Sequence, residues 1–354
     1  MSVFDKKYKQ QGKISLFDEQ EAMEKLSKIG NPLDKISLVI DFEFFRSSLE
    51  SKLLNTEKKN NAGAKPYDVV MMFKILILQR YFGLGDSQVE YQITDRMSFK
   101  RFLGLESGDK IPDEKTVWLF RENLTNSGLV EVLFKQFLEF LDAKDLILNE
   151  GKMIDASFTV APRQRNTKEE NDKIKKGEGK ELWNDKPNKK RQKDIDAKWT
   201  KKNNETFFGY KNHAKVDTKS KIINKYLVTD ASVHDSQALE PLLDEKDKGQ
   251  DLYADSAYTG EKQEETIAKN HLINKVHEKG YRGKPLTEEQ KASNKEKSKT
   301  RARVEHVFGF MEQSMNGLSL KSIGITRATG IIGLINLTYN LFRYEQIVRL
   351  KIEC

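Results

Sequence analysis

The sequence predicts a mixed α/β fold that follows a mainly helical N-terminal region. Apolar residues in the first third recur at helical spacing between glycine turns. From residue 151 onward, apolar and polar residues alternate in short stretches, and helical patterns separate the later ones. Such a mixture predicts a mixed sheet with flanking helices. We divide the chain into an N-terminal extension, a helical region, an α/β region containing a basic insertion, and a C-terminal helical segment: 1–35, 36–145, 146–315 with its insertion at 163–206, and 316–354.

The composition predicts a cytoplasmic protein. The chain has 354 residues, of which 33% are charged and 9% aromatic, too many aromatic residues for a disordered chain. Its one cysteine, Cys354, cannot form an intramolecular disulfide. No signal-peptide core is present, and the longest apolar run, 69–78, is interrupted by Lys74 and too short to span a bilayer. The net charge of +8 is compatible with a polyanionic partner without demonstrating one.

The helical region is predicted from one buried helix and two helix starts. Residues 67–81 are apolar nearly all round, which predicts a helix buried on most of its surface. After Gly83 and Gly85, the pattern Ser87-x-x-Glu90 has the form of a capping box. Asp113 is the expected N-cap of a further helix. Short helices with glycine turns are typical of helix-turn-helix DNA readers and equally of any small helical bundle, so both remain open.

The α/β region is predicted to contain five strands. The first, at 151–160, shows strict alternation, and a turn at 217–220 joins the next two as a hairpin. A final apolar helix at 330–350 is expected to pack on the α/β core or to serve in self-association. The other expected elements are strands at 207–217, 221–232, 250–255 and 271–276, and helices at 236–243, 260–269 and 301–315.

The predicted basic insertion holds most of the net charge. Residues 163–202 contain 15 basic and 8 acidic side chains, a net charge of +7. Charge runs of this kind are usually solvated and partly disordered. A segment that contacts DNA phosphates and becomes ordered on DNA has the same composition, and both interpretations are compatible. A second basic stretch lies at 279–303.

The residue types favour chemistry based on carboxylates. Five histidines and one cysteine make a zinc site unlikely. The phosphate-binding patterns GxGxxG and GxxxxGK[ST] and the nucleophile pattern GxSxG are missing from the sequence. Hard divalent cations bound by carboxylate oxygens remain.

Three carboxylates are the candidates, each with an ordinary structural alternative. Asp155 lies within the first strand, and its alternative is a solvated sheet face. Asp255 follows a strand at the end where α/β sheets bind ligands, whereas Asp251 lies at the opposite end; the alternative for Asp255 is a helix N-cap. Glu305 flanks the apolar stripe of a helix, and its alternative is an i,i+4 ion pair with Arg301. Together the three can converge on two divalent ions, as in-line phosphoryl displacement requires.

These residues resemble a known family. The segments KPYDVVMMFKILILQRYFGLGDSQVEYQITDRMSFKRFLGL, PDEKTVWLFRENL, MIDASF, YADSAYTG and RARVEHVFG occur in the order and at the spacing of the DDE transposases of bacterial insertion sequences, specifically the insertion-sequence-five group. The likeness runs from about residue 40 to 345. The resemblance implies an RNase H-like catalytic region at 146–315, a helical region at 36–145 that recognises element ends, and nucleoid-associated action in bacterial cytoplasm.

The resemblance also implies the site and its partners. Asp155, Asp255 and Glu305 would be the catalytic residues and would bind two Mg²⁺ ions, for which Mn²⁺ can substitute. The enzyme would cleave double-stranded DNA at the terminal inverted repeats of the element and join it to target DNA. It would act as a homodimer in a synaptic complex, and no membrane partner is expected. The predicted DNA contacts are Lys201, Lys202, Lys211, His213, Arg301 and Arg303, with a core or surface role as the alternative for His213.

Two positions depart from the family pattern. Ser298 occupies the place of a tyrosine three residues before Arg301, and Glu312 occupies the place of a basic residue seven positions after Glu305. The role of that basic residue in holding DNA therefore does not transfer. Two rival functions remain: a catalytically inactive, domesticated DNA-binding protein, and a structure-specific nuclease that does not join strands.

Overall fold

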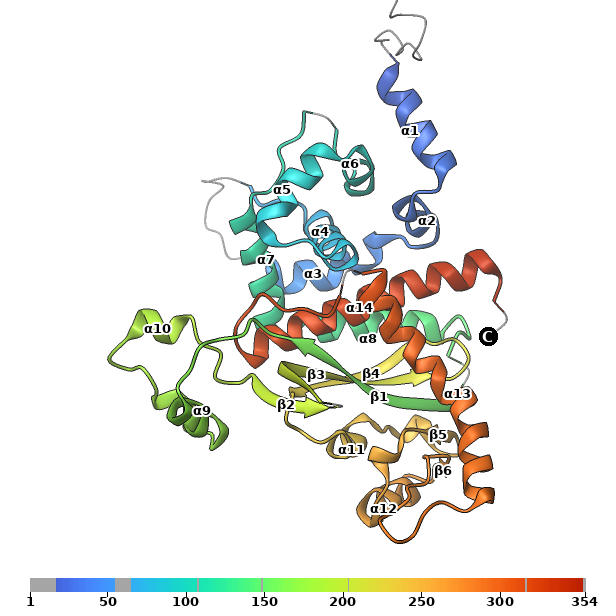
Figure 1. Ribbon diagram of the computed structural model, residues 1–354. Coiled ribbons are helices and arrows are strands. Elements are labelled where there is room, and N and C mark those ends of the chain that lie inside the picture. The colour runs from blue at the N-terminus through green and yellow to red at the C-terminus, as the bar shows by residue number, and fades with distance from the viewer. Residues whose placement is uncertain are drawn as a thin grey trace, which may run out of the picture.

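The computed structural model confirms the mixed α/β fold with a preceding helical region. It describes residues 17–54, 65–106, 108–147, 149–202, 204–315 and 317–352, so Cys354 lies outside the described residues. Figure 1 shows the helical region above the sheet, with α14 (Ile325–Leu350) between them and α13 (Glu288–Gln313) descending along the sheet. None of the helices in these ranges is long and apolar enough to cross a membrane.

Within the described residues, the sheet is built around β1 and the long strand β3. β1 pairs antiparallel with β3 and parallel with β5, which pairs parallel with β6. The other edge of β3 pairs antiparallel with β4 and, nearer its start, with β2. The path β4-β3-β1-β5-β6 is the mixed sheet expected of an RNase H-like fold. The strands are β1 Gly151–Val160, β2 Lys198–Lys202, β3 Glu205–Asp217, β4 Ile223–Asp230, β5 Asp251–Tyr253 and β6 Ile273–Asn274.

The five predicted strands are all present, but the insertion differs from its expected solvated form. It contains α9 (Lys168–Lys175) and α10 (Pro187–Arg191) in addition to β2. Glu170 explains this order, because its carboxylate accepts hydrogen bonds from Trp183 Nε1 at 2.6 Å and Lys189 Nζ at 2.7 Å. A reciprocal capping box between Thr167 and Glu170 begins α9. The charge density of the sequence does not reveal these local contacts, so the order of the insertion could not be predicted from it.

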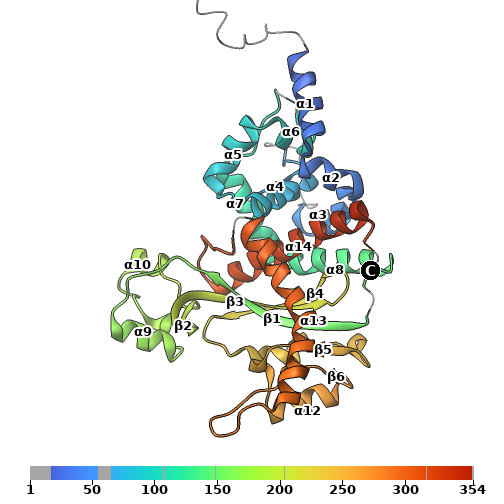
Figure 2. The same cartoon turned by 45° about the vertical axis from the view of Figure 1, so that its right-hand side comes forward.

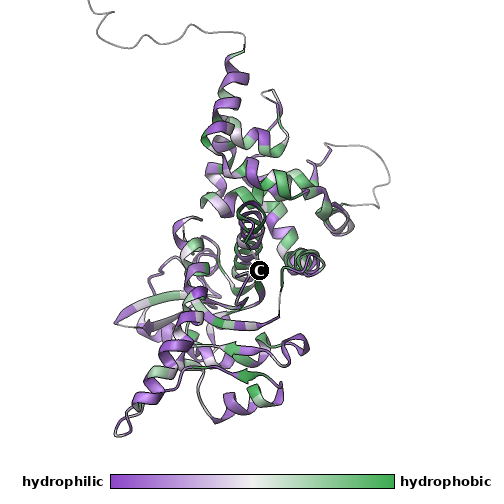
Figure 3. Cartoon of the chain, turned by 90° about the vertical axis from the view of Figure 1, so that its right-hand side faces the viewer, coloured by the Kyte–Doolittle hydropathy of each residue, from purple (hydrophilic) through white to green (hydrophobic). Residues whose placement is uncertain are grey.

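The helical region contains the predicted elements with one shifted boundary. Asp113 caps α7, as expected, by accepting a hydrogen bond from the Thr116 amide. α5 begins at Asp86 rather than at the predicted Ser87, because Gln88 accepts from the Gly85 amide and Asp86 pairs with Arg121. α1 has no buried residue and is largely hydrophilic in Figure 3. The helices are α1 Asp18–Ile29, α2 Pro32–Val39, α3 Arg46–Leu53, α4 Val69–Phe82, α5 Asp86–Asp95, α6 Met97–Leu103, α7 Glu114–Asn126 and α8 Leu129–Asp142.

Two apolar cores cover the two faces of the sheet. The larger core is continuous from the helical region through α14 and α13 to one face of the sheet. α14 accordingly packs on α4 and α8 as well as on β4, and Figure 2 shows it between the helices and the sheet. The smaller core lies on the opposite face beneath α11 (Leu239–Leu242) and α12 (Glu261–Lys269). The predicted C-terminal helix therefore packs on the α/β core.

Candidate active site

The parallel pairing of β1 with β5 brings Asp155 and Asp255 together. The last paired residues of the two strands are Met153 and Tyr253; Asp155 lies two residues farther along β1, and Asp255 lies two residues beyond the end of β5. Asp255 also caps a short 3-10 turn, where its carboxylate accepts a hydrogen bond of 2.8 Å from the Ala257 amide. Both the predicted strand-end position and the alternative capping role of Asp255 are therefore present.

Asp155 lies in an environment that disfavours its negative charge. Its side chain is 16% exposed. Burial, reinforced by the nearby Asp255 carboxylate, raises the pKa of Asp155 to about 6, against the opposing hydrogen bond from the Ala156 amide and the charge of Arg301. A second carboxylate beside a buried one is an arrangement that a cation relieves.

Arg301 connects Asp155 with Glu305. It projects from α13, which lies along β1 and β5, as Figure 2 also shows. One guanidinium nitrogen of Arg301 is 3.4 Å from Asp155 Oδ2, and the other is 2.6 Å from Glu305 Oε1. Glu305 itself is 57% exposed. The i,i+4 ion pair proposed as the alternative for Glu305 is thus present, and the same arginine links it to the buried aspartate.

The donor set fits a hard divalent cation at the two aspartates. Their carboxylate oxygens are the ligands that Mg²⁺ prefers, and the pKa of Asp155 is raised mainly by burial and further by the neighbouring Asp255 carboxylate. No three His, Cys, Asp or Glu side chains of the described residues already meet as a metal cluster. Glu305 is engaged through Oε1 with Arg301 and is more than half exposed.

Two residues near the aspartates were not predicted as site residues. The Tyr258 hydroxyl is buried and has no hydrogen-bond partner among the described residues; burial raises its pKa well above the usual value, and the charges of Asp155 and Asp255 act in the same direction. His277 lies 3.3 Å through Nε2 from the Ser298 hydroxyl, and burial lowers its pKa. His277 directly follows the fifth predicted strand, and this strand-end position could have marked it as a site residue.

The side chains of Lys211 and His213, both predicted to contact DNA, are buried and hydrogen-bonded within the fold. The Lys211 ammonium is buried and donates to the Val233 carbonyl at 2.6 Å and to Asp235 at 2.8 Å. His213 is fully buried and bonds to the Thr229 hydroxyl, and burial lowers its pKa to about 4. Both side chains are thus engaged within the fold, as the core alternative for His213 expected, and DNA contact by either residue stays a prediction.

The other predicted DNA contacts occupy more open positions. Lys201 and Lys202 are exposed on β2, and Arg303 is exposed on α13, where it also donates to the Thr218 carbonyl. Lys202 lies 5.8 Å from the ring centre of Phe158. Arg301 is the exception, since it is held between carboxylates. DNA contact by these four residues stays a prediction.

Comparison with known proteins identifies the family. Residues 150–341 match the family described as Transposase DDE domain, and residues 20–123 match the one described as Transposase domain (DUF772). Among solved structures, the chain is similar to a piggyBac transposase in a synaptic complex with hairpin DNA, at 11% sequence identity and a TM-score of 0.45, covering 93% of this chain and 78% of that one. Because the first match spans more than half of the sequence, the protein belongs to the DDE transposase domain family and is a transposase.

Proposed function

We propose that this transposase belongs to the insertion-sequence-five group, cleaves DNA at the ends of its element and joins the freed 3′ ends to target DNA. The observation that carries this proposal is the placement of Asp155 beside Asp255 with Arg301 leading to Glu305. We also propose that the helical region at 36–145 contacts element ends and that two copies act together on double-stranded DNA.

Asp155, Asp255 and Glu305 would hold two Mg²⁺ ions. Such ions activate the attacking water or hydroxyl and stabilise the leaving oxygen of an in-line displacement. Asp155 supplies negative charge from within β1 and Asp255 from the turn that follows β5, whereas Glu305 approaches from α13. Arg301 partly neutralises this charge. It contacts both Asp155 and Glu305, so it keeps Glu305 on the same side of α13 as Asp155.

Cleavage by matched variants tests the catalytic residues. We expect Asp155→Asn, Asp255→Asn and Glu305→Gln each to lower the Mg²⁺-dependent cutting rate by more than about 100-fold, because even outer partners of metal ligands cost about 10- to 100-fold when removed. The measurement uses the purified chain and a labelled duplex made from the DNA flanking its own gene. Asp251→Asn, at the opposite end of β5, and Glu312→Gln, farther along α13, are controls that should retain activity.

The products distinguish the proposed function from its rivals. Cut ends joined to a second duplex, and lost in Glu305→Gln but not in Glu312→Gln, would support transposition. Cutting without joined product would instead identify a nuclease. Binding of element ends without cutting under Mg²⁺ or Mn²⁺ would identify a DNA-binding protein that retains the fold. Equal loss of binding and cutting in Asp155→Asn would mean that the residue has a structural role.

A further inference from the structure

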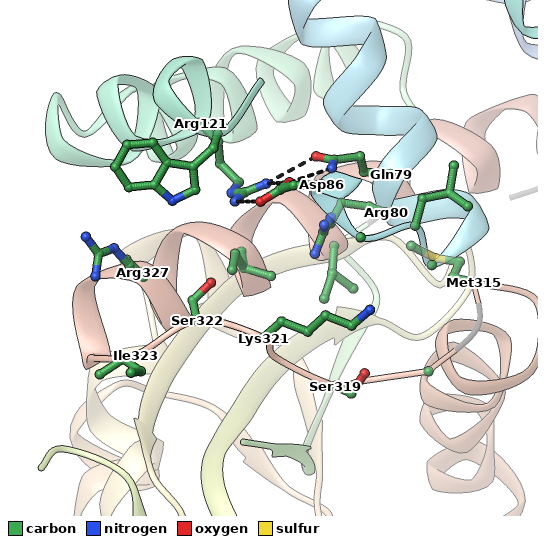
Figure 4. Close-up of a pocket in the computed structure, with 17 residues that line it drawn as sticks. Gln79, Arg80, Asp86, Arg121, Met315, Ser319, Lys321, Ser322, Ile323 and Arg327 are labelled. Carbon is green, nitrogen blue, oxygen red and sulfur yellow. Dashed lines mark hydrogen bonds and ion pairs between the residues drawn. The ribbon is translucent and has the colours of Figure 1, made fainter. Parts of the chain in front are cut away.

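A cavity lined by basic side chains lies where the helical region meets the segment between α13 and α14. Its volume is about 300 Å³, and it is lined by the α4–α5 turn, α7, residues 317–323 and the first half of α14. Figure 4 shows Arg80 and Lys321 directed into the space between these elements. The segment that forms its floor pairs with the end of β1, through the Val160 amide to the Leu318 carbonyl and the Leu320 amide to the Val160 carbonyl.

Arg80 carries a positive charge in this cavity without a partner. It lies in the last turn of α4, and its Nε is buried without a hydrogen-bond partner among the described residues. No ion pair joins it to a residue within those ranges. Burial and the neighbouring charge of Arg121 lower the pKa of Arg80 to about 10. Arg80 is half-buried, and a partly desolvated cation without a partner is one that a bound anion would stabilise.

The carboxylates around the cavity are already engaged. Asp86 accepts both hydrogen bonds of the Arg121 fork, at 2.6 and 2.7 Å, and a third of 2.8 Å from Gln79. Both oxygens of Glu122 accept from the single Nε–H of Arg327, at 2.8 and 2.9 Å. The attraction of Asp86 for Arg80 is therefore shared with a better-placed arginine.

Lys321 is the second cation without a partner among the described residues. A Cβ atom at Gly85 would lie 3.1 Å from Lys321 Nζ, so glycine at this position allows the ammonium to reach the turn. Ser319 and Ser322 add hydroxyl groups to the same lining. The lining therefore offers two cations without partners and two hydroxyl groups, and its one described carboxylate, Asp86, is already paired. Such a lining suits a small, highly charged anion.

We propose that this cavity binds a phosphate group of a DNA backbone, held between Arg80 and Lys321. A strand bound there would be fixed at the junction of the helical region with the end of the strand that carries Asp155. Binding of a phosphate follows from the cavity alone, whereas its assignment to DNA rests on the proposed function. The two parts are tested separately.

The first experiment measures phosphate binding without DNA. Sodium phosphate should raise the melting temperature of the full chain above that in sodium chloride of equal ionic strength. Arg80→Met and Lys321→Gln should abolish that rise, and Arg80→Met should be at least as stable as the parent protein without phosphate, since it removes a half-buried, unpaired charge. Lys299→Gln, an exposed lysine on α13, is the control. No phosphate effect on the parent protein, or an undiminished one in both variants, would overturn the site.

The second experiment assigns the phosphate to DNA. In an Asp155→Asn background, which prevents cutting, the slope of log affinity for an element-end duplex against log salt should fall by about 1 in Arg80→Met and in Lys321→Gln. An unchanged slope together with phosphate stabilisation would overturn the DNA assignment and leave a site for free phosphate. Both readouts are independent of cleavage, so the failure of transposition chemistry would not be mistaken for failure of this site.

Discussion

At the residue scale, the positive charge between the acids comes from one arginine. Arg301 contacts Asp155 and Glu305 from a single guanidinium, while burial and, to a lesser degree, the Asp255 carboxylate just beyond β5 raise the pKa of Asp155. The three acids therefore form a connected electrostatic unit before any cation is bound. In the proposed function, divalent cations would be held by the same carboxylates.

His213 gives the molecule a pH-dependent stability. Its pKa falls from 6.5 to about 4, mainly through burial, opposed by Asp235 and reinforced by Lys211. Because the folded state binds this proton less tightly than the unfolded state does, the stability that His213 contributes is present above about pH 6.5. It is lost as the pH falls toward 4.

We predict that the parent protein loses about 3 kcal/mol of unfolding free energy relative to His213→Asn between about pH 7 and pH 4. Urea denaturation at several pH values measures this difference. His306→Asn, which replaces an exposed histidine on α13, should keep the pH dependence of the parent. A parallel pH dependence of the parent and His213→Asn would show that His213 titrates as an ordinary histidine.

Residue patterns located the acids but not their partners. Asp155 and Asp255 could be predicted because strand alternation and strand ends fix where such side chains lie. The contacts of Lys211 and His213 could not be predicted, because alternation along β3 does not reveal that both of its edges are paired and both faces are covered. Arg80 was not predicted, because its buried Nε without a partner is a property of the folded chain.

At the element scale, the insertion is a folded unit attached at a defined base. Gln164 and Asp194 close that base with reciprocal hydrogen bonds of 2.6 and 2.8 Å. Asp194 also accepts from the Tyr210 hydroxyl and the Gly324 amide, and so joins the insertion to β3 and to the start of α14. Composition predicted the charge of this segment correctly, but only tertiary contacts determine its order.

Removal of the insertion tests its role in DNA binding. A chain lacking residues 166–193, bridged by a short glycine-serine linker, retains Gln164 and Asp194 and should remain folded. We predict weaker DNA binding with a shallower salt dependence, by about 0.9 in slope for each lost phosphate contact. Filter binding over a range of salt concentrations measures the slope, and circular dichroism checks folding. A slope equal to that of the parent chain would show that the insertion is solvated and makes no contact with DNA phosphates.

At the scale of the whole molecule, α14 joins the helical region to the catalytic sheet. Asn336 exchanges hydrogen bonds of 2.8 and 3.1 Å with Asn212 of β3, and Asn340 bonds to both backbone groups of Ile223. These buried amides fix the position of α14 along the sheet, while its apolar residues pack on α4 and α8. The helical region and the sheet therefore share one core.

Gly333 shows how closely this joint is packed. A Cβ atom there would lie 2.4 Å from the Tyr226 hydroxyl of β4 and 2.7 Å from Val130 Cγ1 of α8. α14 thus lies in contact with both layers at a single residue. An added methyl group must push α14 away from one layer or the other, and either movement disturbs the shared core.

We predict that Gly333→Ala lowers the free energy of unfolding by about 1–3 kcal/mol, the usual cost of overpacking. Gly309→Ala in α13 is the matched control: a Cβ at Gly309 meets nothing within 4 Å, and alanine favours a helix by about 1 kcal/mol. Calorimetry should show one cooperative transition in both variants, displaced downward only in Gly333→Ala. Two separate transitions in the parent protein would contradict a shared core, because the helical region and the sheet would then unfold independently.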